Sequence, residues 1–270
     1  MDGLQKDSIT ALKPSHTDRK AGIYLFHSES HELMQKISER NPDGVFDMIF
    51  ADPPYLLSNG GISCSSGKVV SVNKGKWDKS QGPELDFQST LTWLSLCQKL
   101  LKKDGTIWVS GTRHNIFMVG YAMQLLGMKM LNDIVWEKPN PPPNLSCRYF
   151  THSTESIIWA AKNHKSKHHF EYELMKDHAG GKQMKSVWKF LPPNASEKTF
   201  GKHPTQKPVG LLERIILSST KEDDLILDPF TGSSTTGVAA KLHGRRFVGI
   251  DSELDFIELS ARRLGMEHAS

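Results

Sequence analysis

Cysteine and long apolar runs are scarce in this sequence. Its 270 residues include three cysteines, Cys64, Cys97 and Cys147, an odd number with no CxxC pair among them. This pattern supports neither a disulfide framework nor a zinc ribbon, and it indicates a reducing compartment. No apolar core of a signal peptide follows Met1, and no later stretch is long and apolar enough to cross a bilayer. We expect a cytoplasmic protein with no membrane partner.

Positive charge is concentrated in one segment. Between Lys138 and Lys207 there are 12 Lys and Arg against 5 Asp and Glu, whereas the rest of the chain carries 22 basic against 25 acidic residues. A localised positive field is typical of a protein that binds a phosphate backbone, although a basic run can also be a solvated face. His164, His168 and His169 lie among lysines with no cysteine or acid spaced to complete a zinc site, so we expect no metal.

Hydrophobic patterning predicts a regular alternation of strands and helices. Strands are expected at residues 23–26, 45–51, 106–110, 133–136, 156–161, 225–227 and 246–250, and helices at 30–37, 91–101, 116–126, 208–216, 236–242 and 255–263. Such alternation indicates an α/β fold with a largely parallel sheet covered on both faces. Residues 1–20 are polar and unpatterned, which predicts a flexible tail. Residues 56–84 are rich in glycine and serine, which predicts a long mobile loop.

The motif Asp52-Pro53-Pro54-Tyr55 directly follows the strand predicted at residues 45–51. Open α/β sheets place their chemistry at the carboxyl ends of strands. Proline fixes its own φ and restricts the residue before it, so the two prolines hold Asp52 and the nearby carbonyl groups in a nearly fixed shape. A rigid set of acceptors beside an aromatic ring suits a planar substrate that carries an amino group. A proline-rich turn that merely ends a strand is the alternative.

A second turn, Asp228-Pro229-Phe230-Thr231-Gly232-Ser233-Ser234-Thr235, joins a predicted strand to a predicted helix. Its small residues let a ligand approach the N–H groups that begin the helix. A P-loop requires Lys where Val238 stands, and Ser234 interrupts the GxGxxG spacing of a dinucleotide site. A nucleoside without a pyrophosphate remains, because Asp251 ends the next strand, where an acid accepts hydrogen bonds from ribose hydroxyls. This pattern fits S-adenosylmethionine. A tight turn in which Asp251 caps the next helix stays open.

A third motif, His203-Pro204-Thr205-Gln206-Lys207-Pro208, precedes the helix that leads into this turn. Lys207 is therefore expected near the mouth of the cofactor site, where it can pair with a carboxylate. Taken together, the three motifs resemble those of the DNA amino-methyltransferases of the β class, from about Ile23 to Leu264. In that class the Asp-Pro-Pro-Tyr motif comes first, the target-recognition region second and the cofactor motifs last, as they do here.

One position of this sequence departs from the family's cofactor signature, and two segments resemble a particular subgroup of the family. The family's Phe-x-Gly-x-Gly signature is matched by Phe230 and Gly232, but Ser234 stands in place of the last glycine, which puts close contact with the cofactor at Ser234 in doubt. Residues 57–63 and 144–155 resemble the smaller, second methylases of DpnII-type restriction systems, which act at GATC. Relatives of that smaller type are associated with single-stranded as well as duplex DNA.

The resemblance implies a fold and a division of the chain. The fold is Rossmann-like and typical of S-adenosylmethionine-dependent methyltransferases, with a mostly parallel seven-stranded sheet, one antiparallel strand and helices on both faces. The expected parts are a flexible tail (1–20), a catalytic half (21–138), a β-hairpin strand with a target-recognition insertion (139–202) and an S-adenosylmethionine-binding half (203–270).

The resemblance also implies three groups of site residues. The catalytic residues are Asp52, Pro53, Pro54 and Tyr55. The cofactor-binding residues are Asp52, Lys207, Asp228, Phe230, Gly232, Ser233, Ser234, Thr235 and Asp251, with Lys207 on the methionine carboxylate. The DNA-binding residues are Lys138, Arg148, Tyr149, Phe150, Lys182 and Lys185. Besides DNA, the implied partners are a cognate restriction endonuclease and, with the oligomeric state open, a second copy in a homodimer.

These residues suit methyl transfer to an amino group. Asp52 and the Pro53 carbonyl can accept the two N–H groups of adenine N6, and Tyr55 can stack on the base once it has left the helix. The family uses Asp at the first motif position for adenine and Ser for cytosine N4. Carbon-5 methylation is excluded because no cysteine follows a proline. Cytosine N4, RNA, and a non-catalytic nucleic-acid-binding protein remain as alternatives.

Overall fold

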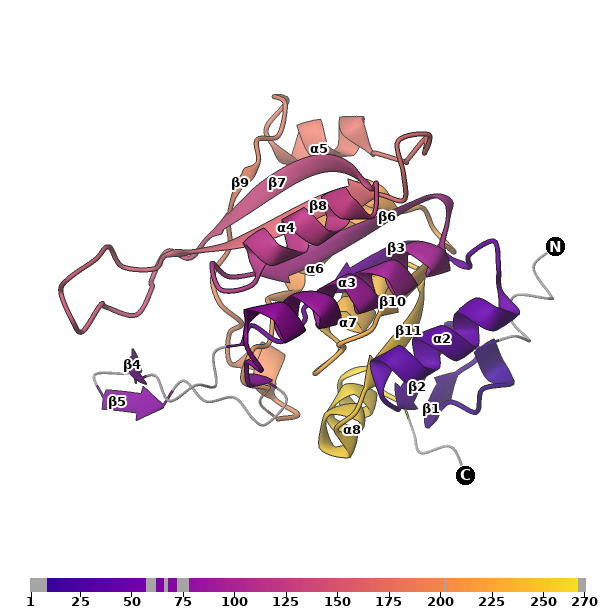
Figure 1. The fold of residues 1–270 in the computed structure, drawn as a ribbon, viewed down its shortest axis with the longest axis horizontal. Helices are drawn as coiled ribbons and strands as arrows, with labels where there is room; N and C mark the ends of the chain where they lie inside the picture. The colour runs from indigo at the N-terminus through magenta and orange to yellow at the C-terminus, as the bar shows by residue number, and fades with distance from the viewer. Residues whose placement is uncertain (1–8, 57–61, 66–67, 72–77, 202, 267–270) are drawn as a thin grey trace.

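A nine-stranded sheet runs through the protein, in the order β1-β2-β11-β10-β3-β6-β8-β7-β9 (Figure 1). The computed structural model describes residues 9–56, 62–65, 68–71, 78–201 and 203–266. The strands of this sheet are β1 (His16–Asp18), β2 (Ile23–His27), β3 (Phe46–Ala51), β6 (Leu101–Gly111), β7 (Lys129–Glu137), β8 (Thr154–Ala161), β9 (Val187–Lys189), β10 (Leu225–Asp228) and β11 (Arg246–Asp251).

The predicted α/β fold is confirmed, but the sheet is larger than predicted. The central strands β2, β11, β10, β3 and β6 are parallel, and β8 runs antiparallel to both β6 and β7. Together with β7 they form the expected seven strands, one of them antiparallel. Two three-residue strands extend the edges, β1 antiparallel to β2 and β9 parallel to β7. Three residues are too few to show a periodic pattern, which explains why the sequence did not predict them.

Helices cover both faces of the sheet, as Figure 1 shows. One group consists of α2 (Ser30–Arg40), α3 (Pro83–Leu100) and α4 (Ile116–Leu125), and the other of α6 (Val209–Ser219), α7 (Thr235–Leu242) and α8 (Leu254–Arg263). Two hydrophobic cores result: Ile49 of β3 packs in the first, and its neighbours Met48 and Phe50 pack in the second. Strands buried on both faces read as continuous apolar runs, which made β3 predictable from its sequence.

The predicted tail is only partly outside the fold. Ile9 is 2% exposed and His16 is 3% exposed, and β1 pairs with β2. The prediction of a flexible tail over residues 1–20 is therefore wrong for the part that packs against the sheet, while residues 1–8 lie outside the described residues.

The segment predicted as a mobile loop, residues 56–84, contains a hairpin. Strands β4 (Ile62–Ser65) and β5 (Lys68–Ser71) pair antiparallel, and α3 begins at Pro83. Residues 57–61, 66–67 and 72–77 lie outside the described residues, so mobility stays a prediction.

The predicted recognition region carries more structure than its weak periodicity indicated. The connection between β7 and β8, residues 138–153, extends away from the body of the protein in Figure 1. We call it the recognition loop. The segment after β8 adds α5 (Tyr172–His178), β9 and the 3-10 turn η2 (Ser196–Lys198). Within the described residues, no helix has the length and apolar character needed to span a membrane.

Candidate active site

The carboxyl ends of β3, β10 and β11 open onto a cavity of about 400 Å³. Its walls include Asp52, Pro54, Lys207, Phe230, Gly232 and Asp251. Residues from all three sequence motifs therefore meet at one site, although they are up to 199 positions apart in the chain. A cavity of this size at this edge of an open α/β sheet is the usual place for a small-molecule ligand.

Asp52 is the centre of a hydrogen-bonded cluster. Its Oδ1 accepts a hydrogen bond from the Tyr55 hydroxyl at 2.5 Å, and its Oδ2 accepts one from Lys207 Nζ. The Tyr55 oxygen also lies 2.9 Å from Ser110 Oγ and 3.3 Å from Glu155 Oε2. We call these five residues the Asp52 cluster. The sequence predicted the roles of Asp52, Tyr55 and Lys207 separately, and the structure brings the three into contact.

The two carboxylates of the Asp52 cluster lie beside two ammonium groups, Lys207 within the cluster and Lys138 next to it. Burial raises the pKa of Asp52, and the Lys207 ammonium opposes that shift. Burial alone would lower the pKa of Lys207, but the carboxylates of Asp52 and Glu155 outweigh it and raise the pKa. Burial likewise disfavours the Glu155 carboxylate, yet Lys207 and Lys138 lower its pKa overall. Lys207 and Glu155 are therefore charged at neutral pH, and each stabilises the other.

Asn115 holds the proline segment in place. Its Nδ2 donates to the Pro54 carbonyl at 3.4 Å, and its Oδ1 accepts from the Thr112 N–H at 2.9 Å. Asn115 is 4% exposed and precedes α4. Sequence reasoning gave no role to Ser110, Asn115 and Glu155, because no motif includes the first two and Glu155 only ends the segment 144–155 that resembles the second methylases. Their one signal is position, since β6 ends and β8 begins beside the carboxyl end of β3.

Tyr55 offers little free ring surface. It is 6% exposed, and Lys207 Nζ lies 5.1 Å from the centre of its ring. A ring that stacks on a base has to present one face to it. Base stacking by Tyr55 stays a prediction, and it requires Tyr55 to become more exposed than it is in this structure.

Two aspartates hold the turn after β10 in place, the buried Asp228 and the half-buried Asp251. Asp228 accepts hydrogen bonds from the Phe230 N–H at 3.1 Å and the Thr236 hydroxyl at 2.6 Å, and burial raises its pKa to about 7. Asp251 accepts from the N–H groups of Gly232 and Glu253, both at 2.9 Å, and burial raises its pKa to about 6. Asp228 thus holds the turn together. Asp251 does the same and still lines the cavity, with lone pairs left for further donors.

Of the three residues after Gly232, only Ser234 lies away from the cavity. Ser234 has φ of +51°, is 0% exposed, and its Oγ lies 2.8 Å from Thr231 Oγ1. Ser234 is not among the residues that line the cavity, and its contact with the cofactor stays a prediction. Ser233 and Thr235 line the cavity, and Arg263 of α8 donates hydrogen bonds to both.

Aromatic and polar groups complete the walls of the cavity. Phe230 packs edge-on against Trp93 at 5.5 Å, and Phe256 packs edge-on against the ring of His203 at 4.3 Å. Gln206 also lines the cavity, and its Oε1 is buried without a hydrogen-bond partner among the described residues. Such walls can enclose an aromatic base, and the Gln206 oxygen can accept a hydrogen bond from a ligand.

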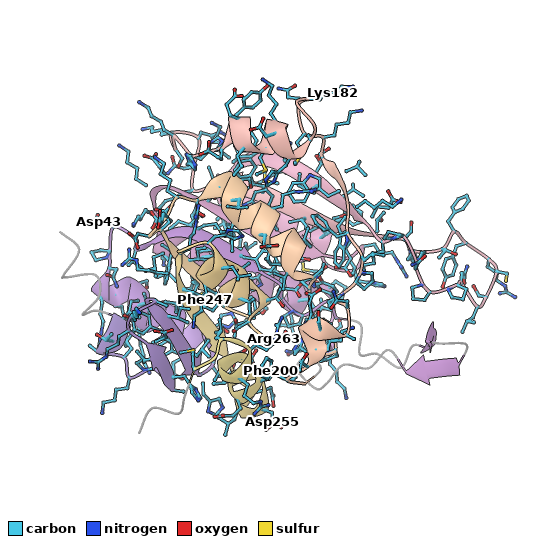
Figure 2. All side chains as sticks on the ribbon, turned by 180° about the vertical axis from the view of Figure 1, so that it is seen from behind. Asp43, Lys182, Phe200, Phe247, Asp255 and Arg263 are labelled. Atoms are coloured by element: carbon cyan, nitrogen blue, oxygen red, sulfur yellow. The ribbon has the colours of Figure 1, made fainter. Side chains whose placement is uncertain are left out.

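The predicted DNA-binding residues lie in three separate places. Arg148, Tyr149 and Phe150 are exposed on the recognition loop, with Phe150 at 96%. Lys138, at the base of that loop, is half-buried in an ion pair with Glu155 instead of facing outward. Figure 2 shows Lys182 at the top of the molecule, well away from the recognition loop, and the exposed Lys185 follows it in the chain.

Comparisons with known proteins agree with this geometry. A family model described as DNA methylase matches residues 46–262. This range includes β3, β10 and β11, the three strands that end at the cavity. The chain belongs to the DNA methylase family. Two curated relatives of this DNA methylase are the type II methyltransferases M2.LlaDCHI of Lactococcus lactis subsp. cremoris and M2.DpnII of Streptococcus pneumoniae. They are 56% and 53% identical, over 95% and 96% of this chain and 93% and 95% of their own lengths.

Solved structures place the DNA methylase in the same fold. The crystal structure of an M1.HpyAVI–SAM complex is 28% identical, covers 90% of this chain and 98% of its own, and superposes with a TM-score of 0.67. The cytosine-N4-specific PvuII DNA methyltransferase is 20% identical, covers 93% and 88%, and shares the fold with a TM-score of 0.72. The resemblance to DNA methyltransferases, the enzymatic activity and S-adenosylmethionine as the cofactor are thereby confirmed.

The cavity of the DNA methylase fits S-adenosylmethionine. The cofactor combines an aromatic base, a ribose and an amino acid. The cavity offers aromatic rings at Phe230 and Phe256, a carboxylate at Asp251 and an ammonium group at Lys207. No three His, Cys, Asp or Glu side chains of the described residues come together as a metal site.

Proposed function

We propose that this DNA methylase methylates adenine at N6 within GATC, in single-stranded as well as duplex DNA. The observation that carries the proposal is the carboxylate of Asp52 on the cavity wall, with Tyr55 and Lys207 bonded to it. The motifs that resemble DpnII-type second methylases support GATC, as do the names of the relatives M2.DpnII and M2.MboI of Moraxella bovis, the latter 56% identical over 82% of this chain and 81% of its own length.

The cofactor would be held by three groups. Asp251 accepts hydrogen bonds from the ribose hydroxyls, Lys207 pairs with the methionine carboxylate, and Phe230 contacts the adenine ring. When bound, S-adenosylmethionine supplies a methyl group on a positively charged sulfur. The residues of the turn after β10 need little rearrangement for this, because their hydrogen bonds already fix the backbone.

Asp52 makes the target amino group reactive. The lone pair of an exocyclic amine is delocalised into the base, so the nitrogen is a poor nucleophile. Asp52 accepts one N–H and the Pro53 carbonyl the other, which localises the lone pair on nitrogen. The carboxylate also stabilises the positive charge that develops on the nitrogen during transfer. The methylated nitrogen is far more acidic than the starting amine and loses its proton after transfer, so Asp52 acts as acceptor and electrostatic stabiliser more than as a strong base.

The Asp52→Ala variant tests this role. We expect methyl transfer to fall by at least about 100-fold, because one side chain supplies both the acceptor and the charge. S-adenosylmethionine affinity should stay within about threefold, since a factor of three is under 1 kcal/mol. Incorporation of labelled methyl groups and titration calorimetry measure the two effects. Asp43→Ala, which removes an exposed carboxylate at the opposite end of β3, is the control. Substantial turnover by Asp52→Ala would contradict the assigned role.

Product analysis decides between acceptors. A cytosine-N4-specific enzyme shares this fold, so the fold alone does not select adenine. Mass analysis of nucleosides after reaction should give N6-methyladenine from oligonucleotides that contain GATC, single-stranded or duplex, and none from matched oligonucleotides with GTAC. N4-methylcytosine, or methylation of RNA in preference to DNA, would replace this proposal with one of its alternatives.

We also propose a cytoplasmic location, a cognate restriction endonuclease as partner, and a homodimer. The type II names of the relatives support the endonuclease. An apolar stripe on α4 supports the homodimer: Phe117, Tyr121 and Leu125 recur every four residues and are 76%, 56% and 56% exposed. Apolar stripes of this kind on soluble proteins often mark protein interfaces.

A further inference from the structure

Both carboxylate oxygens of Asp52 are occupied in this structure. Oδ1 accepts from the Tyr55 hydroxyl and Oδ2 from Lys207 Nζ. An amino group of the target base needs one of these oxygens in the geometry proposed above. Each oxygen can accept a second hydrogen bond, but the new donor then competes with Tyr55 or Lys207 for the same oxygen, so one of these two bonds weakens when the base enters the site.

Glu155 is placed to receive both donors. Its Oε2 lies 3.3 Å from the Tyr55 oxygen and 3.8 Å from Lys207 Nζ, just beyond the two bonds that Asp52 makes. The side chain of Glu155 is 11% exposed, and that of Lys207 is 6% exposed. Two donors thus lie between two carboxylates in a site that excludes most water. A small displacement transfers a hydrogen bond from Asp52 to Glu155 without leaving a buried charge unpaired, which would be costly.

Glu155 also lies at the base of the recognition loop. It belongs to β8, and its Oε1 accepts from Lys138, the first residue of the recognition loop. The Lys138 N–H donates to the Ser153 carbonyl at 2.7 Å, which closes the loop. The same side chain therefore contacts the segment that carries Arg148 and Phe150 and the cluster that surrounds Asp52.

We propose that Glu155 is a positioning residue for methyl transfer: it takes over the Tyr55 hydroxyl and the Lys207 ammonium as Asp52 accepts the target amino group. This inference rests on the proposed function, because it assumes that Asp52 is the acceptor. No covalent bond forms or breaks at Glu155, and no proton leaves it. Together with the methionine carboxylate that Lys207 binds in the proposed complex, the negative charge of Glu155 compensates the Lys207 ammonium while one oxygen of Asp52 turns to the substrate.

The role predicts an effect on turnover more than on binding. In Glu155→Gln the side chain keeps its size but loses the charge that holds Lys207, so Asp52 stays bonded to Lys207. We expect kcat to fall about 10- to 100-fold, the range for one charge-assisted hydrogen bond. The KM for GATC DNA and the Kd for S-adenosylmethionine should change less than about threefold, since neither ligand is assigned a contact with Glu155.

Two further variants show whether the charge matters. Glu155→Asp keeps the carboxylate and should recover most of the lost kcat. Glu137→Gln removes a carboxylate from the neighbouring strand, where Glu137 pairs with Lys189 and its side chain is 42% exposed, and should match the parent protein. Glu155→Gln in a Tyr55→Phe background should cost at least about threefold less than in the parent, because the exchanged hydroxyl is already gone.

Three outcomes would overturn the inference. The first is an unchanged kcat in Glu155→Gln, and the second is an equal loss of kcat in Glu155→Asp and Glu155→Gln. The third is a double variant with Tyr55→Phe in which the two losses of activation free energy add fully, as expected of a purely structural defect. The Asp52→Ala control separates this inference from the proposed function. If Asp52→Ala is active, the proposed mechanism itself fails. If Asp52→Ala is inactive and Glu155→Gln is fully active, the role of Glu155 alone is rejected.

Discussion

The turn after β10 and the recognition loop both lead to the Asp52 cluster, and they are built in opposite ways. The turn is buried, and side chains such as Asp228 and Asp251 hold its backbone through hydrogen bonds. The recognition loop extends from the body of the protein, and Tyr149 and Phe150 are 59% and 96% exposed on it (Figure 1). One side of the site is held by internal hydrogen bonds, and the other presents large side chains to solvent.

We attribute the difference to the two proposed ligands, the cofactor at the turn and DNA at the recognition loop. A cofactor of fixed shape binds best to a site that is already formed, because little ordering entropy is lost. DNA has to be contacted along its backbone and its base edges, and a base has to leave the stack. Basic and aromatic side chains on an extended loop suit that task. The comparison predicts that a substitution in the turn weakens cofactor binding but not DNA binding, and that a substitution in the recognition loop does the reverse.

The largest effect is expected from Asp251→Ala. The variant loses the acceptor for the ribose hydroxyls and the bond to the Gly232 N–H, so S-adenosylmethionine affinity should fall on the order of 100-fold. In the parent protein, cofactor affinity should also decline as the pH falls through about 6, where Asp251 becomes protonated. DNA affinity should stay within about twofold, under 0.5 kcal/mol. Titration calorimetry at several pH values measures this, with exposed Asp255→Ala as control. An equal loss of DNA affinity would show that the turn does not act on the cofactor alone.

An intermediate effect is expected from Arg148→Ala. Loss of one phosphate contact should weaken DNA binding about tenfold and reduce the slope of log affinity against log salt by about 1. Cofactor affinity should not change. Fluorescence anisotropy at a series of salt concentrations checks the prediction, with Lys221→Ala, an exposed cation outside the recognition loop, as control. An unchanged salt slope would show that Arg148 does not contact a phosphate.

The smallest effect is expected from Asp228→Asn, and it concerns stability. Burial raises the pKa of Asp228 from 3.8 to about 7 in the folded protein, so the folded state binds its proton more tightly than the unfolded state. This carboxyl therefore costs stability increasingly as the pH rises from about 4 to about 7, and the cost is absent below that window. Because the amide still makes weaker hydrogen bonds, we expect the variant to gain only about 1 kcal/mol at pH 8.

Urea unfolding at pH 4, 6 and 8 measures the effect of Asp228→Asn. The difference in free energy of unfolding between variant and parent should grow with pH. A constant difference would mean that the folded turn does not perturb the titration of Asp228.

The sequence predicted the parts of the site that depend on local pattern. β3 and β10 are short apolar runs followed by a motif, and the small residues around Gly232 indicate close approach of a ligand. The pairing of Asp52 with Lys207 was not predictable, because the two are 155 positions apart and meet only through the sheet order. Asn115 belongs to no motif and Glu155 only ends the segment 144–155, so only the fold reveals their contacts with the site. The inward position of Ser234 depends on its hydrogen bond to Thr231, which no spacing rule contains.

The hairpin of β7 and β8 has a consequence for how such proteins diversify. Its ladder runs from Lys129 opposite Ala161 to Glu137 opposite Thr154, and the recognition loop lies wholly beyond the last pair. Replacing or lengthening that loop changes no strand register, and doubling the length of a flexible loop costs only about 0.6 kcal/mol in closure entropy. We therefore expect that exchanging this one segment can change the target sequence, while the sheet, the cofactor turn and the Asp52 cluster remain as they are.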